Sequence, residues 1–433
     1  MALDSHSYGR SDQRVIGGNI DWPTVGLFGL LLMMGWLNIY AVVYDDSAAK
    51  SFFDLGINSG RQMIFIGAAL VIIFMIMVID MRFYETVAYV IYGVAIFVLI
   101  LVPIIGKEVG GNKSWLGIGS FGVQPSEFAK FAVALAVAKY IGSVGFKMDN
   151  MRNQVILFAM IGVPIGLILL QKDFGTALVF MAFLLAFYRE GMSPFLLIVG
   201  SSAAALFILT LVVPNRHYLE LVVAIIVGIV IFLGKKNIRR IGILVAGALI
   251  IVGFIESTQY IVTHLKPHHQ SRIKVLIDPS SDLRGEGWNV TQSKIAIGSG
   301  GFGGKGYLKG TQTKFDFVPK QSTDFIFCTI GEEWGYIGSL FVVGLFIALI
   351  LRIVFLAERQ KNRFARAYGY SVASLFFAHF AINIGMTIGL FPVVGIPLPF
   401  FSYGGSALWS FTILLFILLK LDSNRGQVLQ RIS

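Results

Sequence analysis

Long apolar stretches, separated by short polar connections, recur along almost the whole chain. A helix needs about 20 apolar residues to cross a lipid bilayer, and twelve stretches come near this length. They lie at 22–44, 62–80, 84–106, 126–143, 154–171, 174–188, 194–213, 219–234, 238–254, 335–356, 365–390 and 406–421. The pattern predicts an all-α polytopic membrane protein with about twelve transmembrane helices.

One long polar segment interrupts this pattern, from His264 to Glu333. A connection of this length is uncommon and usually carries function. Its glycines indicate a backbone that bends sharply or lies close to another segment. They are Gly298, Gly300, Gly301, Gly303, Gly304 and Gly306. We expect the chemistry of the protein in this loop.

Basic residues beside the short loops predict the orientation in the membrane. With the N-terminus inside, most of them lie in the cytoplasm, including the basic run from Arg359 to Arg366. Residues 1–21 have no cleavable signal pattern, so we expect a cytoplasmic N-terminal tail. The C-terminus is then cytoplasmic as well, and the loop 264–333 is extracytoplasmic.

Composition excludes several classes of protein. Only 14% of the residues are charged and 56% are hydrophobic, whereas soluble domains carry about a quarter charged residues. This composition excludes a soluble globular protein. The 37 Phe and 15 Tyr exclude a disordered chain. The single cysteine, Cys328, excludes a disulfide framework and a Cys-based metal site. We expect the net charge of +11 to face anionic lipid, with no nucleic acid as a partner.

Ionisable groups at membrane depth are costly and therefore mark candidate sites. One group follows Pro125, which fits the first position of a helix. Glu127 and Lys130 are three residues apart, so they share one helix face. A local ion pair at the helix start and a substrate site are both open interpretations. A buried Lys130 needs a negative partner or a substrate.

Two aspartates are candidate site residues for the same reason. Asp173 lies in a tight turn between two spans, where capping of the next helix is the favoured interpretation. Asp324 lies where the polar loop gives way to an apolar run. Partial desolvation there suits a general base that works near neutral pH. Capping of the following helix explains Asp324 equally well.

The remaining polar residues provide less evidence for a functional site. His264, His268 and His269 lack the spacing of metal ligands, so no metal site is predicted, and His379 is expected as a packed residue within a span. Glycines and prolines from Gly385 to Gly405 mark a broken helix near the outer face, which is tolerated only where the backbone lines protein or a cavity.

Several motifs, in this order, resemble the SEDS family of bacterial cell-wall polymerases (shape, elongation, division and sporulation). The similarity covers nearly the whole chain and is closest to the elongation branch, which is RodA-like, rather than the FtsW-like division branch. Its most specific pieces are QPSEFAK at 124–130, QSKIAIGSGG at 292–301, GKG at 304–306, GTQ at 310–312, TDFIF at 323–327 and PVVGIPLPFFSYGGS at 392–406.

The resemblance implies a peptidoglycan glycosyltransferase that polymerises lipid II at the outer face of the bacterial cytoplasmic membrane. It also implies a class B penicillin-binding transpeptidase as a partner, and it places the family's catalytic aspartate at Asp324. Substrate-binding groups are implied at Trp115, Gln124, Ser126, Glu127, Lys130, Asp173, Arg272, Gln292, Lys294 and Lys305.

Two features depart from the family pattern. The family has about ten spans, so we expect residues 219–254 to form an inserted helical hairpin within one membrane domain at 22–433. An even number of added spans keeps the sidedness of everything that follows. Ser114 stands where the family often has arginine, so a phosphate contact there is either missing or supplied by Lys113.

In the expected reaction, Asp324 takes the proton of the acceptor sugar's 4-hydroxyl, which attacks the donor's anomeric carbon with inversion. A lipid diphosphate leaves, and its charge needs cations. Lys130, Arg272, Lys294 and Lys305 are the candidates, with Mg²⁺ or Mn²⁺ as an alternative source of charge and no other cofactor expected.

Three alternative functions are a flippase or transporter for lipid-linked precursors, a division-specific FtsW-like polymerase, and a non-catalytic scaffold. A flippase needs polar groups at the membrane midplane and at both faces. The ionisable groups of this chain gather at the outer end, which favours chemistry at the outer face.

Overall fold

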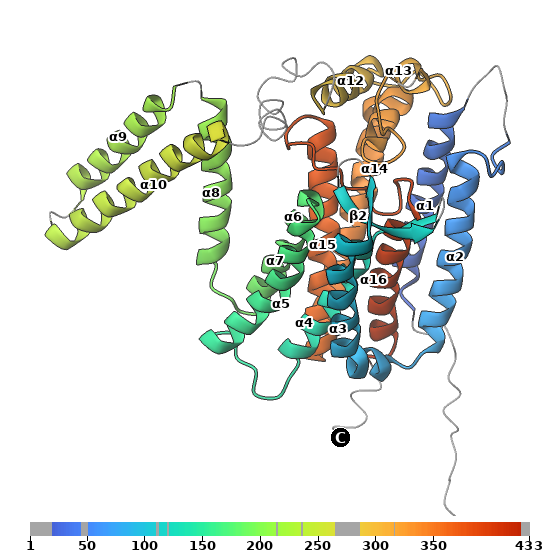
Figure 1. The fold of residues 1–433 in the computed structure, drawn as a ribbon, viewed down its shortest axis with the longest axis horizontal. Coiled ribbons are helices and arrows are strands. Elements are labelled where there is room, and N and C mark those ends of the chain that lie inside the picture. Colours follow the sequence, from blue (N-terminus) through green and yellow to red (C-terminus); the bar gives the residue numbers. More distant parts are fainter. Residues whose placement is uncertain are drawn as a thin grey trace, which may run out of the picture.

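The computed structural model describes residues 20–44, 51–109, 112–118, 121–213, 215–234, 237–264, 286–315 and 317–425. Its helices pack into a bundle, with α12 and α13 at one end and the C-terminus at the other (Figure 1). The helices before the long loop are α1 (Trp22–Val43), α2 (Asn58–Val78), α3 (Met81–Ile105), α4 (Pro125–Ile141), α5 (Met151–Leu170), α6 (Phe174–Phe180), α7 (Phe183–Arg189), α8 (Phe195–Val212), α9 (His217–Leu233) and α10 (Ile238–His264). The helices after it are α12 (Glu286–Ser299), α13 (Thr311–Lys314), α14 (Ile326–Glu358), α15 (Arg363–Thr387) and α16 (Gly405–Ser423).

Eight helices of the described part are long and apolar enough to cross a membrane: α1, α2, α3, α5, α10, α14, α15 and α16. Shorter helices account for the remaining predicted stretches, so the all-α polytopic prediction is confirmed. The stretch 174–188 forms two helices, because the chain turns at Met181 and Ala182 between α6 and α7. The ninth stretch was expected to end at Phe254, whereas α10 continues to His264.

A small antiparallel sheet lies in the connection between α3 and α4, and the sequence pattern did not predict it. Its strands are β1 (Lys107–Val109), β2 (Asn112–Ile118) and β3 (Phe121–Val123), in the order β1-β2-β3. Trp115 pairs with Lys107, and Leu116 pairs with Val123. Strands of three to seven residues are too short to show a clear alternation of apolar and polar positions.

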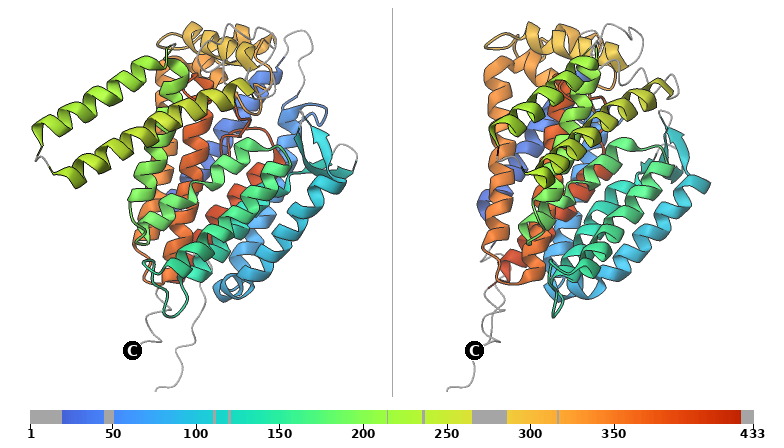
Figure 2. Two further views of the ribbon diagram at one scale, coloured as in Figure 1. Left: turned by 60° about the vertical axis from the view of Figure 1, so that its left-hand side comes forward. Right: turned by 90° about the vertical axis from the view of Figure 1, so that its left-hand side faces the viewer.

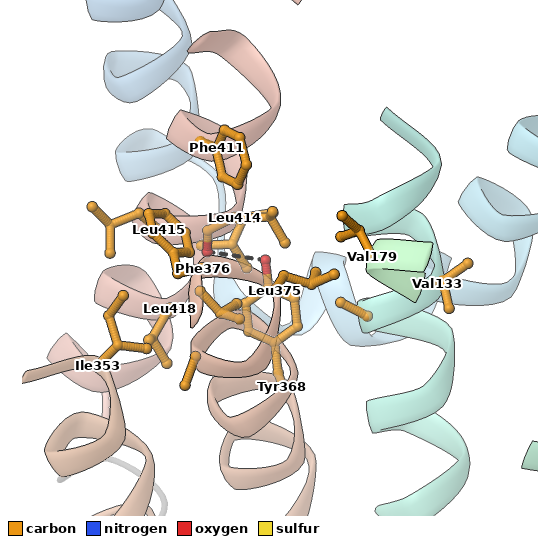
Figure 3. Packing of buried hydrophobic residues seen from close by; sticks show 14 of the residues in the cluster. Val133, Val179, Ile353, Tyr368, Leu375, Phe376, Phe411, Leu414, Leu415 and Leu418 are labelled. Carbon is orange, nitrogen blue, oxygen red and sulfur yellow. Dashed lines mark hydrogen bonds between the residues drawn. The ribbon is translucent and has the colours of Figure 1, made fainter. Parts of the chain in front are cut away.

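The core lies between α4, α14, α15 and α16, where large side chains interlock (Figure 3). Phe376 and Phe411 meet edge to face, with ring centroids 5.0 Å apart. The buried Tyr368 hydroxyl donates a hydrogen bond to the Leu414 carbonyl, 3.1 Å away, which joins α15 to α16. A buried phenol normally needs such a partner, so this contact helps to fix the register of the two helices.

The long loop packs closely on α14. A Cβ atom at Gly300 would lie 2.0 Å from the Gly331 carbonyl oxygen, and one at Gly304 would lie 2.2 Å from the Glu333 carbonyl oxygen. Any side chain at these two positions would clash with backbone. The prediction of a glycine-rich backbone that lies close to another segment is therefore confirmed at Gly300 and Gly304.

Helix α14 bends sharply at Gly335, which has a φ of 63° and a ψ of −157°. A Cβ atom at Gly338 would lie 3.9 Å from the side chain of Ile330. Eight residues of straight helix span about 12 Å, so the two parts of α14 fold back toward each other. The predicted span 335–356 corresponds to the part after this bend.

Helices α9 and α10 run side by side and extend away from the bundle (Figures 1 and 2). None of the α9 residues is buried, and α10 packs on α9 and α8. The predicted hairpin 219–254 lies within this pair. Its status as an insertion, and the division into a tail, one membrane domain and a catalytic loop, stay predictions.

Candidate active site

Four of the predicted site residues meet in one cavity of about 300 Å³: Trp115, Gln124, Asp173 and Asp324. They come from β2, the residue before α4, the residue before α6 and the segment before α14. The broken segment between α15 and α16 closes the cavity with Val393, Val394, Gly395, Pro397 and Tyr403. The cavity thus collects groups from five parts of the sequence.

The backbone around Asp324 is fixed on both sides. Its amide donates to the Lys320 carbonyl at 3.1 Å, and its carbonyl accepts a hydrogen bond from the Asn383 side chain at 2.9 Å. Helix α14 begins two residues later, with Phe325 at the N-cap and no side-chain cap. The capping interpretation of Asp324 is therefore wrong, and its carboxylate lines the cavity.

The Asp324 side chain is only 14% exposed, and its Oδ2 lies 3.9 Å from the Lys320 ammonium. A Cβ atom at Gly395 would lie 3.3 Å from the same oxygen. Gly395 has a φ of +67°, a conformation that side chains disfavour. The glycine leaves room for the carboxylate to face the cavity.

Asp173 caps α6, as the sequence favoured. Its Oδ1 accepts from the Thr176 amide at 3.1 Å, and its Oδ2 accepts from the Thr176 hydroxyl at 2.9 Å. The Gln124 side-chain amide also donates to Oδ2 at 2.9 Å, and the Ser126 hydroxyl lies 3.5 Å from it. Asp173 therefore orients Gln124 at the cavity wall.

Glu127 and Lys130 form the predicted ion pair, 2.7 Å apart, behind the cavity. The Lys130 side chain is completely buried and also contacts Nε2 of His379 at 2.8 Å. Nδ1 of His379 lies 3.0 Å from the Pro397 carbonyl oxygen, so Nδ1–H donates there and Nε2 accepts from Lys130. The chain of contacts ends at Pro397 in the cavity wall, which suits a positioning role for Lys130.

Gln292, Lys294 and Lys305 do not line this cavity. Lys305 pairs with Glu332 at 2.6 Å, and Glu332 also accepts from the amides of α13. Gln292 is buried in α12, whereas Lys294 is exposed on the same helix. Arg272 lies outside the described residues, as do His268 and His269.

The cavity also contains residues for which the sequence predicted no role. Lys172 and Lys320 line the cavity with their positive charge. The Ser406 hydroxyl accepts a hydrogen bond from the Gln124 amide at 3.1 Å. No sequence signal indicated Lys320, and nothing in the sequence linked Ser406 to Gln124.

The described residues of the cavity do not form a complete metal site from protein ligands alone. Within the described ranges, no group of three or more His, Cys, Asp or Glu side chains is placed to hold one. Both oxygens of Asp173 already accept hydrogen bonds from Thr176.

An apolar cavity of about 410 Å³ lies between α3 and α4, beside the sheet. Its lining includes Val94, Leu116, Val123, Pro125 and Phe128. Leu116 follows Trp115 and Pro125 follows Gln124, so the two cavities share β2 and the start of α4.

Comparison with known proteins agrees with this arrangement. The FTSW_RODA_SPOVE family model, described as "Cell cycle protein", matches residues 22–220 and 188–427. The peptidoglycan glycosyltransferase RodA of Treponema pallidum is 31% identical over 92% of this chain and 98% of its own. The peptidoglycan glycosyltransferase MrdB of Escherichia coli K12 is 33% identical over 88% of each chain.

Solved structures share the fold. A chain from a structure described as "Structural coordination of polymerization and crosslinking by a peptidoglycan synthase complex" has a TM-score of 0.68 and 24% identity, and the match covers 94% of this chain and 99% of that one. The rod shape determining protein RodA of Thermus thermophilus has a TM-score of 0.60 at 23% identity, over 94% and 97% of the two chains. The present chain is a multi-pass integral membrane protein that belongs to the FtsW, RodA and SpoVE family.

Proposed function

We propose that this protein is a peptidoglycan glycosyltransferase that polymerises lipid II into glycan strands during cell-wall elongation. The observation that carries the proposal is the cavity in which Asp324 meets Trp115, Gln124 and Asp173. The similarity to RodA and MrdB, both peptidoglycan glycosyltransferases, supports the same activity.

In the proposed reaction, the Asp324 carboxylate takes the proton of the 4-hydroxyl of the acceptor sugar. The hydroxyl oxygen then attacks the anomeric carbon of the donor with inversion, and the bond to the diphosphate oxygen breaks. The released electron pair stays on the lipid diphosphate. Asp324 suits the role of base because its backbone is held by Lys320 and Asn383 while its carboxylate faces the cavity.

The substrate would approach from the membrane. A polyprenyl chain is far too apolar to cross a polar loop without a large cost. The apolar cavity between α3 and α4 is lined by Leu116 and Pro125, the sequence neighbours of Trp115 and Gln124 in the catalytic cavity, so we infer that it receives the lipid tail.

We infer the sidedness and the partner from the same proposal. Both termini would be cytoplasmic and the catalytic loop would face the outside of the cytoplasmic membrane. The basic run near Arg363 supports this orientation. The partner would be a class B penicillin-binding transpeptidase; a structural relative comes from a peptidoglycan synthase complex that coordinates polymerization and crosslinking.

Polymerisation of purified lipid II by the parent and by Asp324→Asn tests the proposal. A positioned base typically contributes about 10²- to 10⁴-fold to a rate, so the variant should lose activity by about that factor while it stays folded. Glu108→Gln is the matched control, because Glu108 is an exposed acid of β1 outside the cavity. Polymerised product is separated by gel electrophoresis, and folding is checked by thermal melting.

Three outcomes would contradict the proposal. Parental polymerisation by Asp324→Asn would remove Asp324 from catalysis. Movement of labelled lipid II across vesicles by a parent that makes no glycan would identify a flippase instead. If the parent makes no glycan by itself, and if the parent and the Asp324→Asn variant support the activity of the partner equally well, the protein is a scaffold.

A further inference from the structure

Two lysines of the cavity share an unusual backbone conformation. Lys172 has a φ of 62° and Lys320 has a φ of 57°. Within the described residues, only four residues other than glycine have positive φ. Residues other than glycine are strained in this region by roughly 1 kcal/mol, and such strain gathers at functional sites.

Lys172 occupies a position that glycine normally fills. Helix α5 ends with the Lys172 amide bonded to the Leu169 carbonyl and the Asp173 amide bonded to the Ile168 carbonyl. This is the Schellman pattern, in which the residue after the C-cap is left-handed and usually glycine. A lysine there places an exposed ammonium at the cavity directly beside Asp173.

Lys320 is anchored in a comparable way. Its carbonyl accepts hydrogen bonds from the amides of Thr323, Asp324 and Phe325, at 3.1 to 3.3 Å. The Lys320 side chain is 53% exposed, and its ammonium lies 3.9 Å from Asp324. The turn therefore positions the lysine and the catalytic aspartate together.

Two of the cations that the sequence suggested, Lys130 and Lys305, are already engaged. Lys130 is enclosed by Glu127, His379 and the ring of Phe411. Lys305 is held by Glu332. Among the described residues, Lys172 and Lys320 are the lysines that line the catalytic cavity, and no described carboxylate pairs with Lys172.

We propose that Lys172 and Lys320 bind the diphosphate of the lipid-linked sugar donor, an inference that rests on the proposed function. Ammonium groups form strong, charge-assisted hydrogen bonds with phosphate oxygens. Charge grows on the diphosphate oxygen as its bond to the anomeric carbon breaks, so both contacts strengthen in the transition state. The left-handed backbone at both positions holds the two lysines at the cavity.

Inorganic pyrophosphate is the direct probe, because its binding does not require turnover. Full-length parent, Lys172→Gln, Lys320→Gln and the double variant are compared in phosphatidylcholine nanodiscs by calorimetry, and with lipid II by steady-state kinetics. Lys309→Gln is the control, since Lys309 is an exposed lysine outside the catalytic cavity. Each cavity variant should weaken pyrophosphate binding and lower kcat/KM by about tenfold or more, whereas the control should match the parent.

Equal binding of pyrophosphate by the parent and the double variant would overturn the assignment, as would a parent that binds none. Loss of pyrophosphate binding when phosphatidylglycerol is added would also overturn it, because the site would then bind a membrane headgroup. A parent that binds pyrophosphate through both lysines but makes no glycan would refute the proposed function alone. A polymerising parent whose double variant keeps its kcat/KM would refute the lysine assignment alone.

Discussion

At the scale of single residues, the cavity depends on contacts between distant parts of the chain. The acids were predictable, because Asp324 and Glu127 lie where polar loops meet apolar runs. The local pair of Glu127 with Lys130 was predictable too, but the contacts with distant parts of the chain were not. Lys130 meets His379, which is 249 residues away, and no spacing rule links two residues so far apart. The sequence therefore predicted the charged groups and one local ion pair, but not the long-range contacts that orient them.

Gly395→Ala should reduce activity while leaving the protein folded. The new methyl group would lie 3.3 Å from Oδ2 of Asp324, at a φ of +67°, so the carboxylate or the backbone must move. A base displaced by a fraction of an ångström loses part of its contribution to the rate. We expect kcat for lipid II polymerisation to fall by about tenfold or more.

Gly162→Ala is the matched control for this change. Gly162 lies in α5, and nothing lies within 4 Å of a Cβ atom there. Alanine forms helix better than glycine by roughly 1 kcal/mol, so this variant should keep its activity and melt at the same or a higher temperature. A Gly395→Ala variant with the kcat of the control would show that this contact does not position Asp324.

At the scale of elements, the bend of α14 separates what could be predicted from what could not. The apolar run after Gly335 predicted a span, and the structure has one. The helical part before it, from Ile326 to Trp334, was assigned largely to the polar loop. Glu332 and Glu333 in this part are charged, and charged side chains are usually exposed. The loop that folds over them buries both.

Gly335→Ala should destabilise the protein. A Cβ atom at Gly335 would lie 2.3 Å from the Gly304 amide nitrogen and 2.8 Å from the Phe302 carbonyl oxygen. Backbone cannot yield as a flexible side chain does, and alanine disfavours the positive φ. We expect the melting temperature in detergent to fall by several degrees.

Gly344→Ala lies in the same helix and provides the comparison. Nothing lies within 4 Å of a Cβ atom at Gly344, so this variant should melt at or slightly above the parental temperature. Equal melting temperatures for the two variants would mean that the loop does not hold the bend in place.

At the scale of the whole molecule, a network of charged side chains joins several helix ends. These helix ends lie far from α12 and α13. Arg352 in α14 donates two hydrogen bonds to Asp21, at 2.6 and 3.0 Å. Arg359 bridges Asp21 and Asp422, which joins α1, α14 and α16. The helix pattern predicted these elements, but the pairing of Asp21 with residues more than 330 positions away required the fold.

Stability at low pH should depend on Asp21. Burial alone would raise the pKa of Asp21, but hydrogen bonds from Arg352 and Thr24 outweigh it and lower the pKa to about 2 from 3.8. A carboxyl whose pKa falls on folding stabilises the folded state while it is ionised. The contribution, about 2 kcal/mol, is present above pH 4 and is lost as the pH falls toward 2.

Asp21→Asn should therefore lower the melting temperature at pH 7 and flatten its decline between pH 5 and pH 3. Asp149→Asn, at an exposed acid in the connection between α4 and α5, should follow the parental curve. Parallel pH curves for Asp21→Asn and the parent would contradict a stabilising role for the ionised carboxyl.

The left-handed backbone at Lys172 and Lys320 has a consequence for protein engineering. Glycine relieves the strain at such positions, so a screen that selects heat resistance alone would favour glycine at both of them. The survivors would be easier to purify and crystallise, yet they would lack two of the charges that face the donor. Libraries built to improve handling of this enzyme should leave these two codons unchanged.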